Sequence, residues 1–289
     1  MTLDWSADHL VSLLSLGVII GVGLLPSRHQ PESRLFARQR WRYPDIVIVF
    51  SLITAVALVP AHVLRTMTLP IWVVEGVGTL VITVSIWGIV RWRHCRTLSA
   101  LGLHTSTASH DALWSLRIGL GIISALIVFV VMVRSLDPQN WHAPGRAVWH
   151  GQVGDFIAGA IVTALFVPVA EELFFRGLAY GPLLRRLGPV GATIASAAIW
   201  ASGHYSGFSP QSLFGVLFTL ILGICYAEVY RRRESLVPAL VFHVLQNTTA
   251  IFIGDRYLVT LIPLAGVAMG LWVVSAALFH VHCSRVRAD

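Results

Sequence analysis

Two adjacent glutamates and an arginine interrupt a long apolar run in the second half of the chain, FVPVAEELFFRGLAYGPLLRR, residues 166–186. Glu172 and Arg176 are four residues apart, so on a helix they share a face and can form an ion pair. Glu171 points about 100° away from Glu172 and has no local partner. A carboxylate in a cavity beside a histidine can act as a general base that activates water. Glu171 is therefore the candidate base, and Glu172 and Arg176 are supporting residues.

Two further polar motifs follow on the next apolar stretches. WASGH ends in His204, and HVLQN contains His243 and Asn247 four residues apart. Two polar donors on one helix face suit an oxyanion hole, which stabilises the charge that develops on a carbonyl attacked by water. An ionisable residue inside a spanning helix costs about 2.5–3.5 kcal/mol, so such residues are candidates for function. We expect His204 to be the neighbour of Glu171.

Helix geometry predicts that these side chains lie in a common layer. Glu171 and His204 each lie about 21–22 Å along their helices from the arginine-rich turn that joins them. His243 and Asn247 lie about 14 and 20 Å from the next arginine-rich turn. A catalytic cluster inside the bundle is therefore expected, and it would be reached from the side of these turns.

The three motifs, in this order, resemble those of the CPBP intramembrane proteases, which are the CAAX-type prenyl-protein proteases and their bacterial relatives, also called Abi proteins. EELFFR corresponds to Glu-Glu-x-x-x-Arg, WASGH to Phe-x-x-x-His and HVLQN to His-x-x-x-Asn, over residues 156–253. The resemblance implies a peptide-bond hydrolase in which Glu171 and His204 hold and activate water, while His243 and Asn247 form the oxyanion hole. Trp200 stands where the family usually has Phe, which bears on the shape of the pocket.

The composition places the chain in a membrane. Hydrophobic residues make up 56% of it and charged residues 12%, with a mean hydropathy of +0.74, whereas soluble domains have about 25% charged residues. We expect an all-α, polytopic transmembrane helix bundle of about 8–9 spans in a single domain, residues 1–289, with helices of unspecified role in 1–150 and the catalytic core in 151–256. The apolar stretches that approach the ~20 residues of a spanning helix are Leu10–Leu25, Ile46–Leu64, Pro70–Val90, Ile118–Val133, Phe156–Leu184, Val190–His204, Gln211–Tyr230, Leu236–Ile253 and Leu258–His280.

The arginines are concentrated in alternate loops, chiefly residues 28–42, 91–96, 185–186, 231–233 and 285–287. By the positive-inside rule these loops are cytoplasmic, which puts the N-terminus outside and the C-terminus inside. The pI of about 10.0 then reflects topology and attraction to lipid headgroups, and we expect no nucleic-acid partner. The expected location is the bacterial cell (inner) membrane, and the expected partners are the lipid bilayer and a peptide or membrane-protein substrate, which is cut near the cytoplasmic face.

Several alternatives stay open. No cofactor is favoured, but Glu171, His204 and His243 could form a His2Glu zinc site with one open position; the absence of an HExxH motif from the sequence and the presence of Asn247 argue against it. Intramembrane histidines beside an arginine-paired glutamate also suit the proton relay of a transporter. An inert relative could bind a peptide as an immunity or scaffold protein. Glu75 stands alone in an earlier span, and we expect it to be structural.

Overall fold

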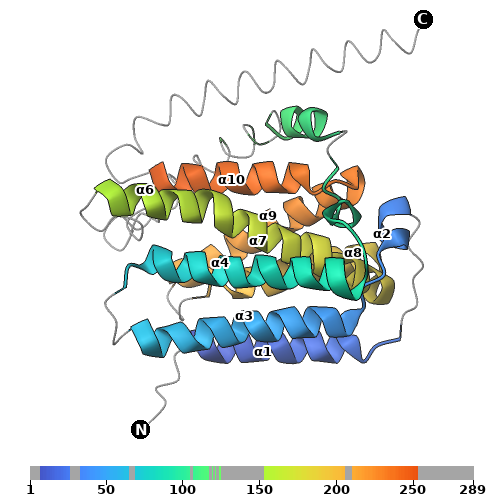
Figure 1. Ribbon diagram of the computed structural model, residues 1–289, viewed down its shortest axis with the longest axis horizontal. Helices are drawn as coiled ribbons and strands as arrows, with labels where there is room; N and C mark the ends of the chain where they lie inside the picture. Colours follow the sequence, from blue (N-terminus) through green and yellow to red (C-terminus); the bar gives the residue numbers. More distant parts are fainter. Residues whose placement is uncertain are drawn as a thin grey trace, which may run out of the picture.

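The computed structural model describes residues 7–26, 33–64, 69–104, 107–116, 119, 121, 124, 153–205 and 210–252. Every regular element in these ranges is helical, as the composition predicts (Figure 1). The expected span Leu258–His280 lies outside the described residues, and only three positions of Ile118–Val133 are described. The elements are α1 Ala7–Gly23, α2 Arg34–Arg38, α3 Tyr43–Leu64, α4 Ile71–Gly88, η1 Ile89–Arg93, η2 Leu98–Leu101, α6 Val153–Ile161, η4 Val162–Phe166, α7 Val167–Glu172, η5 Leu173–Ala179, α8 Tyr180–Ser202, α9 Pro210–Arg233 and α10 Val237–Phe252.

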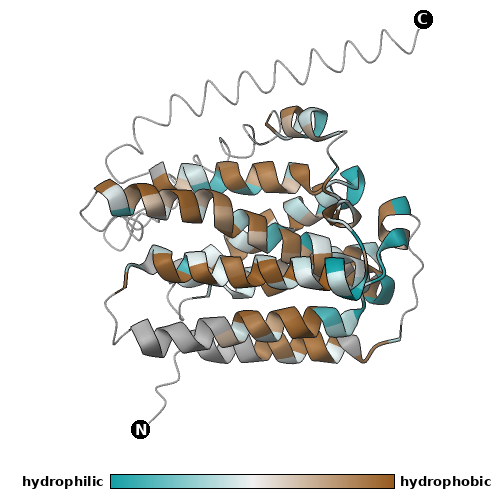
Figure 2. Ribbon diagram, viewed as in Figure 1, coloured by the Kyte–Doolittle hydropathy of each residue, from teal (hydrophilic) through white to brown (hydrophobic). Residues whose placement is uncertain are grey.

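Three helical segments of the described chain are long and apolar enough to cross a membrane, namely Trp72–Arg93, Val153–Ser202 and Ser212–Arg233. Hydrophobic residues run along the helices, and hydrophilic residues gather at the end of the bundle where α2 lies (Figure 2). Large apolar side chains such as Leu80 and Leu217 are exposed on the outside of the bundle. Such surfaces are satisfied by lipid tails, so the protein is an integral membrane protein.

The segment Val153–Ser202 holds two expected spans, which meet at an elbow within α8. Gly188 has φ 71° and ψ 178°, a backbone conformation outside the helical region. Glycine adopts a positive φ without steric cost, and Pro189 disfavours the helical conformation in the residue before it. Arg185 donates a hydrogen bond of 2.7 Å to the carbonyl of Trp41, which anchors the elbow beside the start of α3.

The helices pack in sequence across the bundle. α1 packs on α3, α3 on α4 and α4 on α7, while α9 packs on both α8 and α10 (Figure 1). The approach of α8 to α9 is close because Gly223 has no side chain. A Cβ at this position would lie 2.9 Å from the Trp200 ring and 3.0 Å from the Cβ of Ala197. The second half of the chain is therefore held against helices from the first half and against itself.

A buried polar cluster fixes α2 and η2 against the rest of the bundle. The Gln39 amide donates to the hydroxyl of Tyr230 at 3.2 Å, and this hydroxyl donates to the carbonyl of Leu101 at 3.0 Å. Gly177 packs on Leu101, and a Cβ at Gly181 would overlap the Gln39 side chain. These two glycines therefore serve the close approach of α2 and η2 to the helix that carries the glutamates.

A second polar contact joins residues 107–116 to the end of α9. The carboxylate of Asp111 is buried and accepts hydrogen bonds from Arg233 at 2.5 Å and from Thr107 at 3.0 Å. Burial raises the pKa of Asp111, but hydrogen bonds from Arg233, Ser235 and Thr107, together with the Arg233 charge, outweigh burial. The pKa therefore lies below its ordinary value of 3.8.

We predict that Asp111→Asn destabilises the protein by about 1–3 kcal/mol near neutral pH, because a buried hydrogen bond to a charged group is lost. Since the folded pKa is depressed, the stabilisation is present above the ordinary pKa and is lost as the pH falls through the folded value. Thermal unfolding in detergent should therefore show a difference in melting temperature between wild type and Asp111→Asn, and this difference should become smaller in acid. Glu228→Gln, at a more exposed carboxylate near the same end of α9, is a comparison variant that should cost less stability near neutral pH, because solvent screens its ion pairs. A difference in melting temperature that does not depend on pH would contradict a stabilising role of the ionised Asp111 carboxylate.

Candidate functional site

The two adjacent glutamates lie on α7, between two π-helical segments. Pro168 is near the start of α7 and has no backbone N–H, so the carbonyl of Ala164 loses its usual helical partner. The π-helical turn η4 precedes it and η5 follows, and the chain stays helical throughout. Local widening of this kind accommodates a proline and is frequent at functional sites. The motif therefore sits where the helix is least regular.

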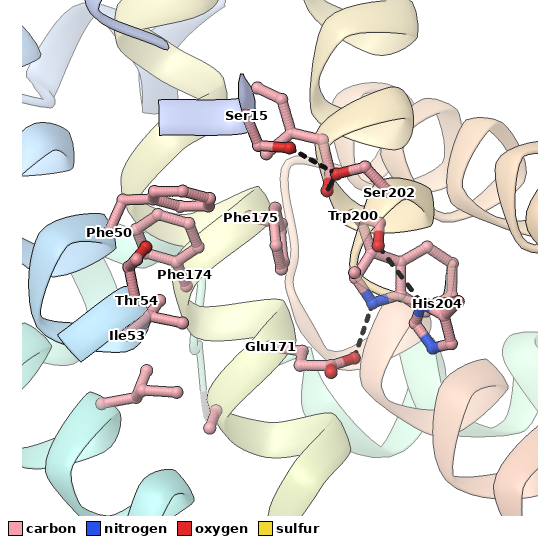
Figure 3. Close-up of a pocket in the computed structure, with 14 residues that line it drawn as sticks. Ser15, Phe50, Ile53, Thr54, Glu171, Phe174, Phe175, Trp200, Ser202 and His204 are labelled. Atoms are coloured by element: carbon pink, nitrogen blue, oxygen red, sulfur yellow. Dashed lines mark hydrogen bonds between the residues drawn. The ribbon is translucent and has the colours of Figure 1, made fainter. Parts of the chain in front are cut away.

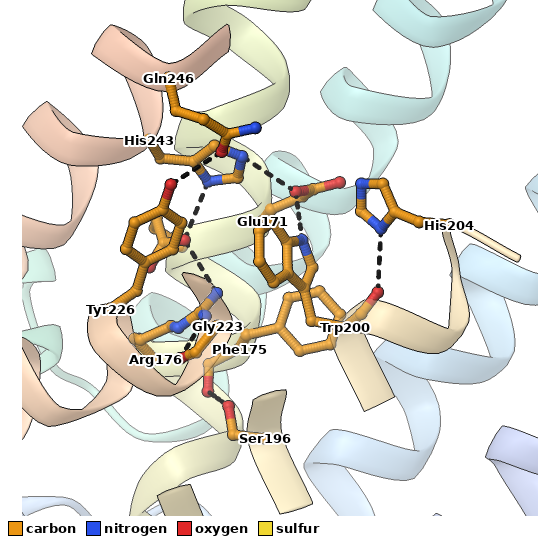
Figure 4. A network of polar contacts seen from close by, with 11 residues as sticks. Glu171, Phe175, Arg176, Ser196, Trp200, His204, Gly223, Tyr226, His243 and Gln246 are labelled. Atoms are coloured by element: carbon orange, nitrogen blue, oxygen red, sulfur yellow. Dashed lines mark hydrogen bonds and ion pairs between the residues drawn. The ribbon is translucent and has the colours of Figure 1, made fainter. Parts of the chain in front are cut away.

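Glu172 and Arg176 form the ion pair that their spacing predicts. The Arg176 Nη1 atom is 2.8 Å from Glu172 Oε1, and both side chains are 0% exposed. Arg176 also donates to the carbonyl of Gly223 at 3.1 Å, and the Nδ1 atom of His243 lies 3.0 Å from the same Glu172 oxygen. One buried charge pair thus joins the motif to α9 and α10 (Figure 4).

Aromatic rings enclose the Arg176 guanidinium. Its central carbon lies 5.0 Å from the centre of the Trp200 ring, 5.4 Å from that of Tyr226 and 5.9 Å from that of Phe175. A cation over an aromatic face is attracted by the negative face of the ring, most strongly when water is excluded. The three rings come from η5, α8 and α9, so Arg176 draws three helical segments together.

Glu171 has partners on other helices. Trp200 Nε1 donates to Glu171 Oε2 at 2.6 Å, and His243 Nε2 lies 3.6 Å from the same oxygen. The Glu171 side chain is 25% exposed, unlike the fully buried Glu172. The hydrogen bond from Trp200 is one that a phenylalanine could not make. The departure from the usual Phe therefore changes a contact to Glu171 as well as the shape of the pocket.

His204 lies just past the end of α8, beside Glu171 in Figure 4. Its Nδ1 atom is 3.2 Å from the carbonyl of Trp200. A carbonyl only accepts, so Nδ1 donates and a neutral ring has its lone pair at Nε2. Among the described residues no hydrogen bond joins His204 to Glu171, and each of them is bonded to a different atom of Trp200. The expected neighbours thus share a cavity and the same partner.

A cavity of about 290 Å³ begins at Glu171 and His204 (Figure 3). Its walls come from α1, α3, α4, α7, η5 and α8 and are mostly aromatic and aliphatic, with Phe50 and Phe174 among them. The hydroxyls of Ser15 and Ser202, 2.8 Å apart, join α1 to α8 beside it. The first half of the chain, for which the sequence assigns no role, therefore forms part of this wall.

Asn247 is held by a short polar chain that begins in the first half of the protein. Its amide Nδ2 donates to the carbonyl of Thr163 at 2.9 Å, and the Thr163 hydroxyl donates to Glu75 Oε2 at 2.9 Å. The sequence alone favours a structural role for Glu75 as an isolated acid. The sequence feature that could predict its position near Thr163 and Asn247 is that Glu75 is a lone acid in an apolar span.

The side chains of the zinc alternative are Glu171, His204 and His243. Within the described ranges, no group of three His, Cys, Asp or Glu side chains is arranged to hold a metal ion. Nδ1 of His204 faces the Trp200 carbonyl, and Nδ1 of His243 faces Glu172. The cysteines Cys95 and Cys225 are free.

We predict strong coupling within the buried ion pair. Glu172→Gln or Arg176→Leu alone should destabilise the protein by about 3–5 kcal/mol, because each leaves one buried charge without its partner. The double variant should cost clearly less than the sum. Chemical or thermal unfolding of the four proteins in detergent measures the coupling energy.

Glu228 and Arg232 on α9 supply a matched control, since they are also four residues apart and form an ion pair with an exposed arginine. The double-mutant cycle of Glu228 and Arg232 should give a coupling energy below about 1 kcal/mol. If the buried cycle is additive, or no larger than this control, the buried pair is not the stabilising contact described above.

Comparison with known proteins agrees with the geometry. Residues 153–249 match a family model described as type II CAAX prenyl endopeptidase Rce1-like, and this segment holds all three motifs, from α6 to α10. Neither the comparison with curated proteins nor the one with solved structures gives a match. Helices α1 to α4 precede the matched segment. Residues 153–249 of this chain are therefore similar to the Rce1-like family of CAAX prenyl endopeptidases.

Proposed function

We propose that the protein is an intramembrane endopeptidase in which Glu171 and His204 activate water, and His243 and Asn247 stabilise the oxyanion. The observation that carries this proposal is the difference between the two adjacent glutamates. Glu172 is fully buried and paired with Arg176, whereas Glu171 is partly exposed and lines the cavity. Glu171 is therefore the carboxylate available to a substrate and to water.

Glu171 suits the role of general base. One carboxylate oxygen is fixed by the Trp200 N–H, so the other can accept a proton from a water molecule in the cavity. The Nε2 lone pair of a neutral His204 can accept a second hydrogen bond from the same water. Two acceptors orient the water, and its oxygen attacks the carbonyl carbon as Glu171 takes the proton.

Asn247 and His243 suit the role of oxyanion donors. The Asn247 amide has two N–H groups, and Thr163 occupies only one of them. The Nε2 atom of His243 faces the Glu171 side of the cluster. Because Nδ1 of this ring lies against Glu172, the ring donates from Nε2 only in its protonated form. One oxyanion donor contributes about 10²–10³ in rate.

The second half of the reaction returns the proton. The tetrahedral intermediate collapses, the C–N bond breaks, and protonated Glu171 donates its proton to the departing amine. The products are an amine and a carboxylic acid, which loses its proton to solvent, and Glu171 is again ionised. Glu171 therefore acts first as a base and then as an acid.

The cavity favours an apolar substrate segment. Its volume of about 290 Å³ is close to the lower limit of ~300 Å³ for ligand pockets. Aromatic and aliphatic side chains line most of it, which suits the side chains of a peptide or a membrane-protein tail. We infer a peptide or membrane-protein substrate with apolar residues beside the cleaved bond.

The arginine-rich segments meet at one end of the bundle. Arg186 donates to the carbonyl of Leu25, and Arg93 pairs with Asp45 at 2.8 Å. The positive-inside rule supports a cytoplasmic position for this end, an external N-terminus and a location in the bacterial inner membrane. Glu171 lies about 21 Å of helix away from this end, within a ~30 Å hydrocarbon core. The substrate would enter the bilayer from the cytoplasmic face to be cut.

We also propose that residues 1–289 form one domain with a catalytic core at 151–256. Three observations support this organisation: α1, α3 and α4 each contribute to the cavity wall, the Ser15 and Ser202 hydroxyls join α1 to α8, and Glu75 reaches Thr163. The first 150 residues then complete the site and provide membrane attachment.

We predict that Glu171→Gln and His204→Ala lower turnover by about 10²–10⁴-fold, because each removes a group that holds or deprotonates water. Cells that lack the protein would be complemented with wild type or with each variant, and new peptide termini in the membrane fraction would be measured by mass spectrometry. Termini should appear with wild type and with Glu228→Gln, whose carboxylate lies outside the cavity. Equal melting temperatures would show that the variants are folded. The same termini produced by Glu171→Gln would exclude this base.

We further predict that a membrane-permeant chelator leaves the activity of the purified enzyme unchanged. The reason is that Glu171 and His204 can position water without a cation. The substrate would be a peptide that spans a cleavage site found in the cellular experiment. Loss of activity that zinc restores would favour instead the His2Glu site of Glu171, His204 and His243.

A further inference from the structure

A second cavity, of about 260 Å³, lies at the arginine-rich end of the protein. Three segments line it: residues 34–38, residues 96–104 and Glu234. It shares no lining residue with the cavity at Glu171. Its basic residues are Arg34, Arg38, Arg96 and His104, and we call it the arginine cavity. We propose that the arginine cavity binds a phosphate group, carried by an anionic phospholipid or by a soluble phosphate compound.

The arginines of this cavity lack the partners that neighbouring arginines have. Arg93 pairs with Asp45, and Arg233 pairs with Asp111. Arg231 and Arg232 both pair with Glu228. In the part of the chain that the structure describes, no carboxylate lies within ion-pair distance of the three arginines of the cavity. These three arginines are therefore not held in ion pairs, and Glu234 is the one acid in the lining.

Two of these arginines are brought together by the local helix. Arg34 and Arg38 are four residues apart on α2, where like charges repel and destabilise a helix. Arg96 comes from a different segment and is fixed through its backbone N–H, which donates to the carbonyl of Val90 at 2.9 Å. An anion between the three side chains would convert this repulsion into attraction.

Glu234 positions α2 beside the cavity. Its carboxylate accepts a hydrogen bond of 3.1 Å from the backbone N–H of Leu35. Its φ of 50° lies in the left-handed region, which is uncommon for a residue with a side chain. A backbone in this conformation persists only where surrounding contacts hold it. The one acid in the lining therefore serves to place α2, and three arginines remain for a ligand.

Phosphate is the anion that this lining fits best. A guanidinium donates two parallel hydrogen bonds to a phosphate, and it keeps its charge at any physiological pH. Three guanidinium groups exceed what a single carboxylate can pair with, whereas a phosphate offers several oxygens and up to two charges. The hydroxyls of Thr97 and Ser99, 2.7 Å apart, share one hydrogen bond and leave one O–H donor for a ligand at the wall.

The position along the membrane normal supports a lipid as a source. Trp92 is 71% exposed and lies four residues before Arg96. Exposed tryptophans near the end of a spanning helix mark the headgroup level. Basic pockets between helices at the cytoplasmic side bind the headgroups of anionic lipids. Figure 2 shows that the hydrophilic residues around α2 lie at this end of the bundle.

The test uses the full chain in detergent after lipid has been removed. Phosphatidylglycerol, phosphatidylcholine and inorganic phosphate would each be titrated, with bound lipid measured by native mass spectrometry and protection by the shift in melting temperature. We expect phosphatidylglycerol to bind and stabilise the wild type more than phosphatidylcholine. The double variant Arg38→Gln/Arg96→Gln should bind it at least about tenfold more weakly. Arg40→Gln, at an exposed arginine outside the cavity, should bind as the wild type does.

The outcomes distinguish an anionic phospholipid from a soluble phosphate compound as the carrier of the phosphate group. Protection by inorganic phosphate that the double variant loses, with no preference for phosphatidylglycerol, would assign a soluble phosphate compound. Equal binding of every probe by wild type, Arg40→Gln and the double variant would overturn the proposal. Arg34→Gln, at an exposed position, supplies the same comparison if the double variant does not fold. Neither readout depends on proteolysis, so the result stands apart from the proposed catalytic mechanism.

Discussion

The ion pair between Glu172 and Arg176 is the contact on which the catalytic cluster depends. Both groups are removed from water, and a buried charge without a partner costs several kcal/mol. Each member therefore needs every polar contact that its surroundings offer. Arg176 reaches the carbonyl of Gly223 and lies between aromatic rings, while Glu172 accepts from His243. The contacts of this one pair join α7, α9 and α10, although Glu172 Oε2 and Arg176 Nε are buried without a hydrogen-bond partner among the described residues.

Trp200 links that buried pair to the exposed glutamate. Its ring lies over Arg176, its indole N–H holds Glu171, and its carbonyl holds His204. One side chain and its backbone thus orient two residues that the sequence places in different helices. The absence of a side chain at Gly223 allows α8 to come close enough to α9 for this contact. The polar cluster and the tight helix packing are therefore two parts of one arrangement.

The sequence predicts contacts within one helix better than contacts between helices. Counting residues from the arginine-rich turns places His243 about 7 Å nearer to those turns than Glu171, yet the two side chains approach to 3.6 Å. The four-residue spacing predicts the Glu172–Arg176 pair, because that contact lies within one helix. It does not predict that Trp200 stands between Glu171 and His204, since rotation about the helix axis depends on packing. The π-helical segments on both sides of α7 change that rotation further. The elbow at Gly188 could be predicted, because a Gly-Pro step restricts the backbone directly.

The hydrogen-bonded link from Glu75 through Thr163 to Asn247 crosses the boundary of the family segment, which begins at residue 153. Two segments joined in this way cannot change in sequence independently of each other, because a substitution at Glu75 alters the hydrogen bonding of Thr163. Substitutions on the two sides should compensate one another among close relatives. A chimera that grafts residues 153–249 onto foreign N-terminal helices would place Thr163 beside an unmatched neighbour. The matched segment therefore relies on a hydrogen-bonded contact from outside its own bounds.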